Sequence, residues 1–361
     1  MLSEWERGDS LTVVRNDEYW KTDPESGQQL PYLDSVTFRF ITEAATAQDA
    51  FTARDGDIIT PEATVPVVES LRALESDGAA VEVVSGPTWE HLNFQFGPGR
   101  LNRNPSSCTD RYEMRLAVAQ AIDRDRIVDE VLGGLVEPLN SYVDAFTPSL
   151  SLDAWAAYVA DSAAAAANYQ AASELAGAPC TVVFTTTSTL DERVQMAELF
   201  VGMFEEAGIP FENQLEANQL FFGDTLSTGR WDVGSWAWVG SPGFSGLVNI
   251  HDVFDPEGSL PAGSNYYRWG TTDSSVIDEA TERFAEVRDE MNSTVDNREL
   301  AALVNEAETI LAESLVIIPL YARPSAAAVW ADDIAGFNHN SSVAGYTWNI
   351  ESRYRADLDL P

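Results

Sequence analysis

Two β-type segments joined by a helical segment constrain the fold of this chain more than any other feature. Residues 181–185 are an apolar, β-branched run, residues 191–207 show helical spacing, and residues 211–215 are again β-type. Asp191 lies in the first turn of the expected helix and Gly208 follows its end, which are favoured positions for these residue types. A strand, a helix and a strand joined by short links form a right-handed crossover between two parallel strands. The sequence therefore predicts an α/β fold.

A second helical segment covers residues 116–134. Its apolar residues recur at near-helical spacing: Leu116, Ala119, Ile122, Ile127, Val131 and Leu132. Gly133 and Gly134 follow the last of them, and glycine is favoured there because it adopts the left-handed conformation of a helix C-cap. We therefore predict a single helix that ends at the paired glycine.

Length and periodicity divide the chain into two lobes. A chain of 361 residues can bury more than one core. We predict one lobe from residues 1–88 with 317–361, because β character returns at Ile317, and a second, mostly helical lobe from residues 89–316. We expect the chain to cross from one lobe to the other near Gly86 and again near Pro319. Further strands are predicted at 36–41, 81–84 and 232–236, and further helices at 65–74, 154–176, 276–288 and 298–314.

The charge balance excludes two classes of partner. Lys and Arg number 21 against 58 Asp and Glu, so the formal net charge is −37. Such a chain repels nucleic acids and anionic membranes. No apolar stretch reaches the roughly 18 residues of a membrane span. The acidic composition favours solubility in a salty environment.

The histidines and cysteines give little sign of a metal or cofactor. The three histidines, His91, His251 and His339, lie far apart and show no metal-binding spacing, so we expect no metal and no cofactor. Cys108 and Cys180 are the only cysteines. A disulfide and two separate thiols are equally compatible with the sequence.

Short motifs follow one another along nearly the whole chain in a recognisable order. Ala-Ile-Asp-Arg at 121–124, followed by Ile-Val-x-x-Val-Leu-Gly-Gly, resembles the signature helix of the family-5 extracytoplasmic solute-binding proteins of ABC importers, in a variant like that of actinobacteria. Six further segments resemble family motifs in the family's order: Val14–Trp20, Leu30–Phe40, Asp55–Ile59, His91–Phe94, Ile317–Tyr321 and Asp333–Phe337.

The resemblance implies a two-lobe clamshell of the periplasmic-binding-protein type (cluster C) that captures a solute between its lobes. It implies an extracytoplasmic binding protein, not an enzyme, that delivers peptides or peptide-like solutes to ABC permease subunits. In the family, the element that matches residues 14–20 follows a long N-terminal stretch. We therefore expect a chain without the N-terminal part of lobe I and without the extra small domain. Membrane association would then depend only on a missing N-terminal anchor of lipoprotein type.

The sharpest candidate site lies within residues 232–242. This segment resembles the family's strand and loop in which a Trp, packed against the ligand, precedes by three residues an Asp that binds the ligand's ammonium group. Trp238 matches the Trp, whereas Ser241 replaces the Asp. We predict that Trp236 and Trp238 alternate across the strand, which would place one of the two in the core. We expect Trp238 to face the ligand.

The exchange of Asp for Ser241 has a chemical consequence. A hydroxyl donates and accepts hydrogen bonds but carries no charge. A buried ammonium group without a carboxylate is costly. We therefore do not expect recognition of a free amino terminus here, unless another acid such as Glu62 or Asp224 replaces the missing one.

Three further residues are weaker candidates for ligand contact. Trp89 precedes the expected crossing strand, Thr60 follows the segment at 55–59, and Asn265 lies in a loop that resembles one near the family's cleft mouth. Loop structure without ligand contact is an equally good interpretation of each.

Two alternative functions stay open at this level. Ten Trp and eleven Tyr supply aromatic surfaces that also suit sugar rings, so an oligosaccharide ligand is compatible with the sequence. A secreted carbohydrate-active enzyme would use such surfaces with paired carboxylates. The order of the family motifs favours binding over catalysis.

Overall fold

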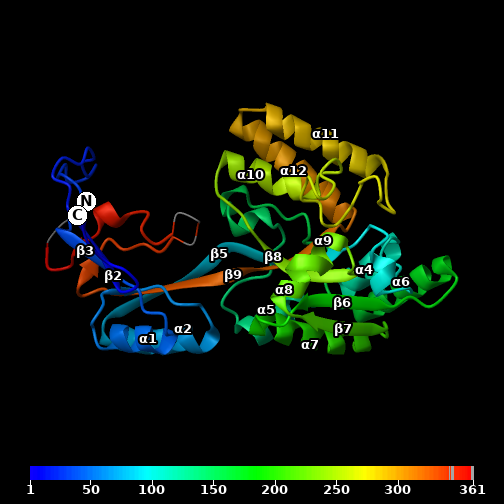
Figure 1. Cartoon of the computed structure of the whole chain (residues 1–361), viewed down its shortest axis with the longest axis horizontal. Coiled ribbons are helices and arrows are strands. Elements are labelled where there is room, and N and C mark those ends of the chain that lie inside the picture. The colour runs from blue at the N-terminus through cyan, green and yellow to red at the C-terminus, as the bar shows by residue number, and fades with distance from the viewer. Residues whose placement is uncertain (341, 343–344, 359–361) are drawn as a thin grey trace. The chain divides into compact units, whose positions relative to one another are not determined.

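The computed structural model describes residues 1–340, 342 and 345–358, and the chain divides into two compact units. Unit 1 comprises Met1–Ser85 and Pro324–Pro361, and unit 2 comprises Gly86–Arg323. Two long strands, β5 (Ala79–Phe94) and β9 (Ile317–Trp330), contribute residues to both units (Figure 1). Helices and strands occur in both units, so the predicted α/β class is confirmed.

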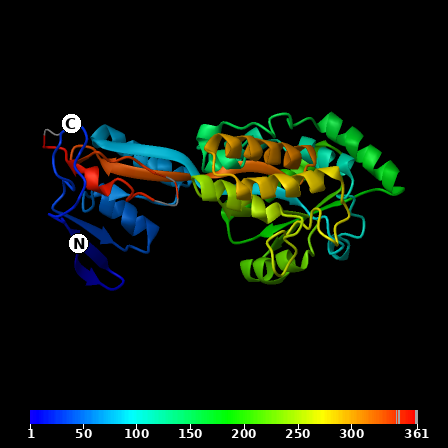
Figure 2. The ribbon, with the colours of Figure 1, turned by 90° about the horizontal axis from the view of Figure 1, so that it is seen from above.

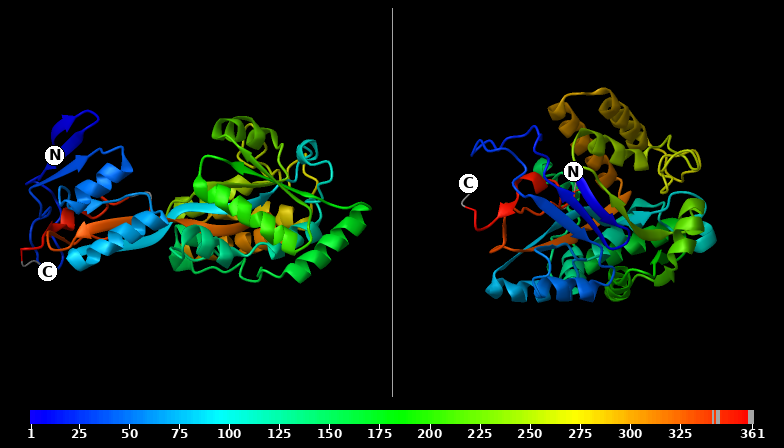
Figure 3. Two further views of the ribbon diagram at one scale, coloured as in Figure 1. Left: turned by 90° about the horizontal axis from the view of Figure 1, so that it is seen from below. Right: turned by 60° about the vertical axis from the view of Figure 1, so that its left-hand side comes forward.

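Unit 1 contains a small antiparallel sheet and a helical layer. The sheet has the order β1-β2-β3. Helices α1 and α2 lie beside the unit 1 portions of β5 and β9 (Figure 3), where Phe51, Leu71 and Trp330 form a small core with Ala79 and Ala328. The elements are β1 (Leu2–Glu6), β2 (Ser10–Val14), β3 (Ser35–Arg39), α1 (Ala44–Thr52), β4 (Ile58–Ile59), α2 (Val65–Arg72), β10 (Ile334–Ala335) and β11 (Tyr354–Arg355).

Unit 2 is built on the β9-β5-β8-β6-β7 part of the larger sheet. Strands β6 (Val182–Thr187), β7 (Phe211–Glu216) and β8 (Val233–Val239) run parallel to one another, and β5 runs antiparallel to β8. Helix α7 (Asp191–Glu206) joins β6 to β7 and packs on both, so the predicted parallel crossover is confirmed.

The other helices of unit 2 cover its sheet. Helices α11 and α12 pack against each other (Figure 2). The helices are α3 (Arg100–Arg103), α4 (Tyr112–Ala121), α5 (Arg124–Leu132), α6 (Ser162–Ala176), α8 (Asn218–Leu220), α9 (Leu226–Thr228), α10 (Phe244–His251), α11 (Glu279–Ser293) and α12 (Asn297–Glu313). A π-helical turn, Phe221–Thr225, connects α8 to α9. Short 3-10 helices lie at Ala73–Asp77, Val143–Ala145, Pro148–Leu150, Asp252–Phe254 and Ile350–Ser352.

The prediction of a single helix over residues 116–134 is wrong. Helix α4 ends at Ala121, Ile122 is extended with ψ 117°, and α5 begins after Asp123. The Asp123 carboxylate accepts a hydrogen bond from the backbone N–H of Arg126, so Asp123 is an N-cap rather than part of a polar helix face. The predicted C-cap is confirmed, because Gly133 adopts a left-handed φ of 58°.

Other boundaries also differ from those predicted. The helix expected at 154–176 begins only at Ser162, because Asp161 caps it. The helix expected at 276–288 begins after Asp278, which forms a capping box with Thr281. Gly86 lies inside the 16-residue strand β5, so the chain does not turn there.

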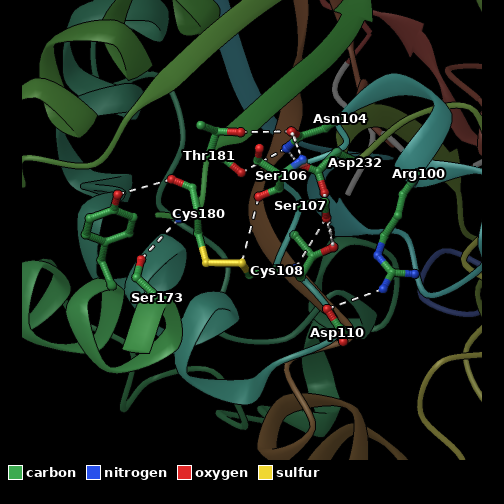
Figure 4. The surroundings of a disulfide bond; sticks show 12 residues. Arg100, Asn104, Ser106, Ser107, Cys108, Asp110, Ser173, Cys180, Thr181 and Asp232 are labelled. Carbon is green, nitrogen blue, oxygen red and sulfur yellow. Dashed lines mark hydrogen bonds and ion pairs between the residues drawn. A yellow bond between two sulfur atoms is a disulfide. The ribbon is translucent and has the colours of Figure 1, made fainter. Parts of the chain in front are cut away.

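A disulfide and a buried carboxylate fasten the loops at the amino ends of β6 and β8 (Figure 4). Cys108 and Cys180 form the disulfide, with Cα atoms 5.7 Å apart and a sequence separation of 72. The Asp232 carboxylate accepts hydrogen bonds from Asn104 Nδ2 at 2.7 Å, Thr109 Oγ1 at 3.1 Å and Ser107 Oγ. Burial raises the pKa of Asp232, and these donors oppose the rise.

We expect loss of the disulfide to destabilise the chain substantially. A cross-link over a loop of this length removes chain entropy from the unfolded state that is worth about 4 kcal/mol. Replacing both Cys108 and Cys180 by Ser should lower the free energy of unfolding by about 2–4 kcal/mol in urea titrations. Each single Ser variant should lose nearly as much as the double variant. An unchanged urea midpoint in the double variant would contradict a formed disulfide.

Candidate functional site

The carboxyl ends of the parallel strands in unit 2 define the candidate site. Strand β6 ends at Thr187 and β8 ends at Val239. Thr88 of β5 pairs with Val239 of β8, and β5 is the next strand in the sheet. Open α/β sheets bind ligands in the crevice outside the carboxyl ends of their strands. Side chains at this edge of the sheet are therefore the first candidates for ligand contact. We call the edge formed by the ends of β6 and β8, at Thr187 and Val239, the carboxyl edge.

One face of the β5–β8 ladder is aromatic. Trp89 pairs with Trp238, and His91 pairs with Trp236, so all four side chains lie on the same face. Trp236 is fully buried and stacks on Tyr267 with ring centroids 5.5 Å apart. Trp238 is only partly buried and lies near Tyr266. Of the two tryptophans of β8, Trp238 is therefore the one with accessible surface.

A short chain of hydrogen bonds orients the Trp238 ring. Trp238 Nε1 donates to Tyr267 Oη at 2.9 Å, and Tyr267 Oη lies 3.3 Å from His91 Nε2. Burial holds the pKa of His91 well below its usual range, so the ring is neutral. The tautomer of His91 decides which of the two groups donates in the contact between Tyr267 Oη and His91 Nε2. Trp238 is thus anchored to the core by its polar edge.

Behind Trp89 the aromatic packing continues to a buried acid. Trp89 stacks on Tyr142 with ring centroids 4.8 Å apart. Next to Tyr142 in the chain, Ser141 Oγ and the Val143 backbone N–H donate to Glu308 Oε1 at 2.9 and 3.2 Å. Glu308 Oε2 has no hydrogen-bond partner among the residues described. Burial raises the pKa of Glu308 to about 8.

The opposite face of β5 carries an ion cluster. The Glu90 carboxylate is fully buried and accepts from Arg193 Nε and Nη2 at 3.1 and 3.0 Å. Arg323 donates to the same carboxylate from Nε at 3.0 Å and also from Nη2. Arg193 Nη1 donates to Thr187 Oγ1 at 2.8 Å, which ties α7 to the carboxyl end of β6. We call Glu90, Arg193 and Arg323 the arginine pair cluster.

The loop after β8 places Ser241 at the surface. Ser241 is exposed, and its backbone lies tightly against α10. A Cβ on Gly246 would lie 1.7 Å from the Ser241 carbonyl oxygen, and a Cβ on Gly240 would lie 1.9 Å from the Phe146 ring. Glycine at both positions is therefore required for this loop path.

The structure separates the six residues predicted to contact ligand. Trp238 and Ser241 offer accessible surface in unit 2, whereas Trp89 and Trp236 are buried in the aromatic core. Asn265 is also buried, and its side-chain amide donates to backbone carbonyls of Phe254, Asp255 and Trp269. Thr60 is exposed and belongs to unit 1. Ligand contact by any of them stays a prediction.

The arginine pair cluster and Tyr267 were missed from the sequence. The available signal was weak: Glu90 follows Trp89 in strand β5, and Arg323 directly follows the apolar segment Ile317–Ala322 in strand β9. A charge in a strand that is buried on both faces requires a partner. The sequence does not identify that partner, because Arg193 and Arg323 lie 103 and 233 positions from Glu90 in the chain.

The two clearest cavities lie elsewhere. One cavity, of about 360 Å³, lies in unit 2, and its lining includes Arg103, Glu216, Asp224 and Arg230. Arg103 already pairs with Glu216, and Arg230 already pairs with Asp224. The other, of about 230 Å³, is an apolar hollow of unit 1 beside Val13, Pro31 and Ile350. Within the described part of the chain no cluster of three or more His, Cys, Asp or Glu could hold a metal ion, and no helix is long and apolar enough to cross a membrane.

Comparison with known proteins identifies the family. The family model described as "Bacterial extracellular solute-binding proteins, family 5 Middle" matches residues 1–247. The chain belongs to family 5 of the bacterial extracellular solute-binding proteins. This family-5 chain is 23% identical over 330 residues to oligopeptide-binding protein OppA of Mycobacterium tuberculosis (strain H37Rv), covering 88% of this chain and 50% of OppA. It thus spans about half the length of this relative.

A second relative and two solved structures extend the comparison. The periplasmic alpha-galactoside-binding protein of Rhizobium meliloti (strain 1021) is 32% identical over 142 residues, which cover 35% of this chain and 19% of that protein. The periplasmic EDTA-binding protein EppA superimposes with a TM-score of 0.74 at 20% identity, covering 99% of this chain and 64% of EppA. NikA from Brucella suis, in complex with Fe(III)-EDTA, superimposes with a TM-score of 0.71 at 18% identity. The match covers 97% of this chain and 67% of NikA. These likenesses show the fold of two-lobe periplasmic binding proteins.

The buried acid behind Trp89 leads to a prediction about pH. The pKa of Glu308 is about 8 in the folded chain against an ordinary value of 4.5, so the folded chain binds this proton more tightly than the unfolded chain does. The stabilisation from Glu308 is therefore fully present below pH 4.5 and is lost as the pH rises through 8, by at most about 1.4 kcal/mol per pH unit. Glu308→Gln should raise the free energy of unfolding at pH 8 by about 2 kcal/mol and leave it nearly unchanged at pH 5.

Urea titrations at the two pH values would measure this difference. Glu306→Gln is the matched control, because Glu306 lies on the same helix but is partly exposed and pairs with Arg283. If Glu308→Gln destabilises the chain equally at pH 5 and pH 8, Glu308 is ionised in the folded chain and the prediction is wrong.

Proposed function

We propose that this chain captures a peptide or peptide-like solute at the carboxyl edge of unit 2 and delivers it to the permease of an ABC importer. The observation that carries the proposal is Trp238, an accessible aromatic ring held by Tyr267 at the end of a parallel strand. A ring fixed in this way packs against a ligand at a small cost in side-chain entropy. The name of the oligopeptide-binding relative supports the choice of peptides.

We further propose that units 1 and 2 are the two lobes of the binding protein and that β5 and β9 connect them. The predicted lobes were residues 1–88 with 317–361 and residues 89–316. Along the chain, the boundaries of the two compact units fall between Ser85 and Gly86 and between Arg323 and Pro324. Two connections that are both continuous strands suit a hinge, because the chain remains ordered while a small number of residues absorb the motion. An extracytoplasmic location follows the family's description as extracellular.

An oligosaccharide is the second candidate ligand. The partly exposed Trp238 and the neighbouring Tyr266, 6.1 Å apart between ring centroids, provide an aromatic surface of the kind on which sugar rings stack. The alpha-galactoside-binding relative favours this alternative over one stretch of the chain. We propose no catalytic turnover for either ligand class.

Calorimetry separates the two ligand classes. We expect tri-alanine to bind the chain saturably and raffinose, an alpha-galactoside, not to bind. Trp238→Ala should weaken tri-alanine at least about tenfold, because it removes stacking area worth roughly 1–2 kcal/mol. Trp20→Ala, which removes an exposed tryptophan of unit 1, is the control and should bind normally. Saturable binding of raffinose instead of tri-alanine would establish the oligosaccharide alternative.

Ser241 supplies a prediction about the amino end of the solute. Because its hydroxyl carries no charge, tri-alanine and N-acetyl-tri-alanine should bind within about threefold of each other. Ser241→Asp should then favour the free amine by about tenfold, since a charge-assisted hydrogen bond contributes roughly 1.5–3 kcal/mol. A preference of the unmodified chain for the free amine by more than ~2 kcal/mol would mean that an acid elsewhere binds the ammonium group.

A further inference from the structure

We propose that Arg268 is a positioning residue for solute capture: it fixes the loop that carries Tyr267, and through Tyr267 it holds the Trp238 ring in place. This inference rests on the proposed capture of a solute at the carboxyl edge, and it adds a residue on which that capture depends. All the residues involved belong to unit 2. We call residues 265–273 the Tyr267 loop.

The backbone of Arg268 has a conformation that is unfavourable for an arginine. Its φ is +58°, in the left-handed region, where the Cβ atom lies too close to the following carbonyl oxygen. Among the residues described, the other non-glycine residues with positive φ are Arg54, Ser151 and Leu315. Glycine would adopt this conformation without strain. The arginine side chain therefore has to offset the strain with its own contacts, and strained residues of this kind cluster at functional sites.

The Arg268 side chain is bonded through all three of its guanidinium nitrogens. Nη2 donates to the Ser227 carbonyl of α9 at 2.9 Å, and Nε lies 3.3 Å from Asp273 Oδ2 in an ion pair. Nη1 donates to the Tyr266 carbonyl at 3.4 Å. Only 14% of the side chain is exposed. It therefore closes the Tyr267 loop on itself and also holds the loop against α9.

Two glycines make room for this side chain. A Cβ on Gly97 would lie 2.3 Å from Arg268 Cδ, and a Cβ on Gly229 would lie 2.6 Å from Arg268 Nη1. Gly97 lies shortly after β5, and Gly229 directly follows α9, so segments far apart in the sequence form the two sides of one slot. A side chain that fills such a slot and is bonded at three nitrogens has little rotamer freedom left.

Arg268 directly follows the residue that holds Trp238. Tyr267 Oη accepts a hydrogen bond from Trp238 Nε1 at 2.9 Å. The Tyr267 ring stacks on Trp236 and Phe254, with ring centroids 5.5 and 4.9 Å away, and this stacking fixes the plane of the ring. It does not fix how far the ring slides within that plane, because stacked rings pack well over a range of offsets. The reach of the hydroxyl therefore depends on the backbone of the Tyr267 loop, which Arg268 locks.

Two substitutions of Arg268 separate positioning from stability. Arg268→Gly removes the side chain together with the backbone strain, whereas Arg268→Ala removes the side chain and keeps the strain. Arg268→Gly should therefore have the higher urea midpoint of the two variants. Both should bind tri-alanine about tenfold more weakly than the unmodified chain in calorimetry, because neither fixes the Trp238 ring before the solute arrives. Weakened binding that follows the side chain and not the urea midpoint is the result expected of a positioning residue.

The indole N–H of Trp238 reports the positioning without any ligand. Its NMR resonance, assigned by its absence in Trp238→Phe, should exchange with solvent at least tenfold faster in Arg268→Gly, because the bond to Tyr267 Oη is loosened. Arg54→Gly is the matched control. Arg54 also has a left-handed φ, of 59°, and pairs with an aspartate, Asp333, but it belongs to unit 1. This variant should leave the Trp238 resonance unchanged.

A second route to the same change leaves Arg268 in the chain. Gly97 does not have a left-handed φ, so alanine is compatible with its backbone, but the new methyl group would enter the slot of the Arg268 side chain. Gly97→Ala should therefore speed the exchange of the Trp238 resonance and weaken tri-alanine, as Arg268→Gly does. Combined with Arg268→Gly it should add little, because the side chain that it displaces is no longer there. Full additivity of the two changes overturns the role of Arg268.

Failure of peptide capture and failure of this proposal give different results. If the unmodified chain does not bind tri-alanine, peptide capture fails, and the Trp238 resonance alone decides whether Arg268 positions the ring. An unchanged resonance in Arg268→Gly overturns the proposal whether or not the peptide binds. Where the peptide does bind, an affinity of Arg268→Gly equal to that of the unmodified chain also overturns it.

Discussion

The burial of β5 on both faces is the constraint on which the rest of unit 2 depends. From Trp89 to Phe94 every residue of this strand is buried, and three of the six are polar: Glu90, His91 and Asn93. A buried polar group without a partner costs about 1–3 kcal/mol, and a buried charge costs more. Each of the three therefore dictates what lies against it. Glu90 requires the two arginines, His91 pairs with Tyr267, and Asn93 donates to the Gly234 carbonyl of β8.

These three requirements place the candidate site. The partner of His91 is also the group that holds the Trp238 indole, so the same hydroxyl satisfies the core and orients an accessible ring. The partners of Glu90 come from α7 and β9, and one of them keeps an accessible edge. The side chains at the carboxyl edge are thus outer members of networks whose inner members are buried. Substitutions that disturb the inner members would change stability and binding together, whereas Trp238 can be changed at the surface.

The sequence predicted the parts of the fold that depend on local pattern. The parallel crossover of β6, α7 and β7 followed from periodicity and short links, and the left-handed cap at Gly133 followed from residue type. The break at Ile122 was missed because Asp123 fits both a polar helix face and an N-cap, and only the path of the chain decides between them. The start of α6 at Ser162 was missed for a related reason, since alanine-rich sequence before Asp161 favours helix but is not helical here.

The candidate site was predictable only along β8. The assignment of Trp236 to the core and of Trp238 to a more exposed position agrees with their burial. The predicted alternation across the strand is wrong, because the period of a strand is two and residues 236 and 238 lie on the same face. Trp236 is buried where it stacks on Tyr267, whereas Trp238 lies nearer the end of the strand. Glu90, Arg193 and Arg323 lie in three different elements, and no local pattern links them. Their contact arises from the order of strands in the sheet, which a single sequence does not reveal.

The net charge of −37 bears on which solutes can bind. At physiological ionic strength the charge of a surface is screened within about 8 Å, so the acidic surface disfavours the approach of any anion at short range only. A solute whose charges sum to zero meets no net repulsion from that surface. A dianion meets that repulsion with both of its charges. The net charge of the chain therefore favours zwitterions, the ordinary form of a small peptide, over free diacids.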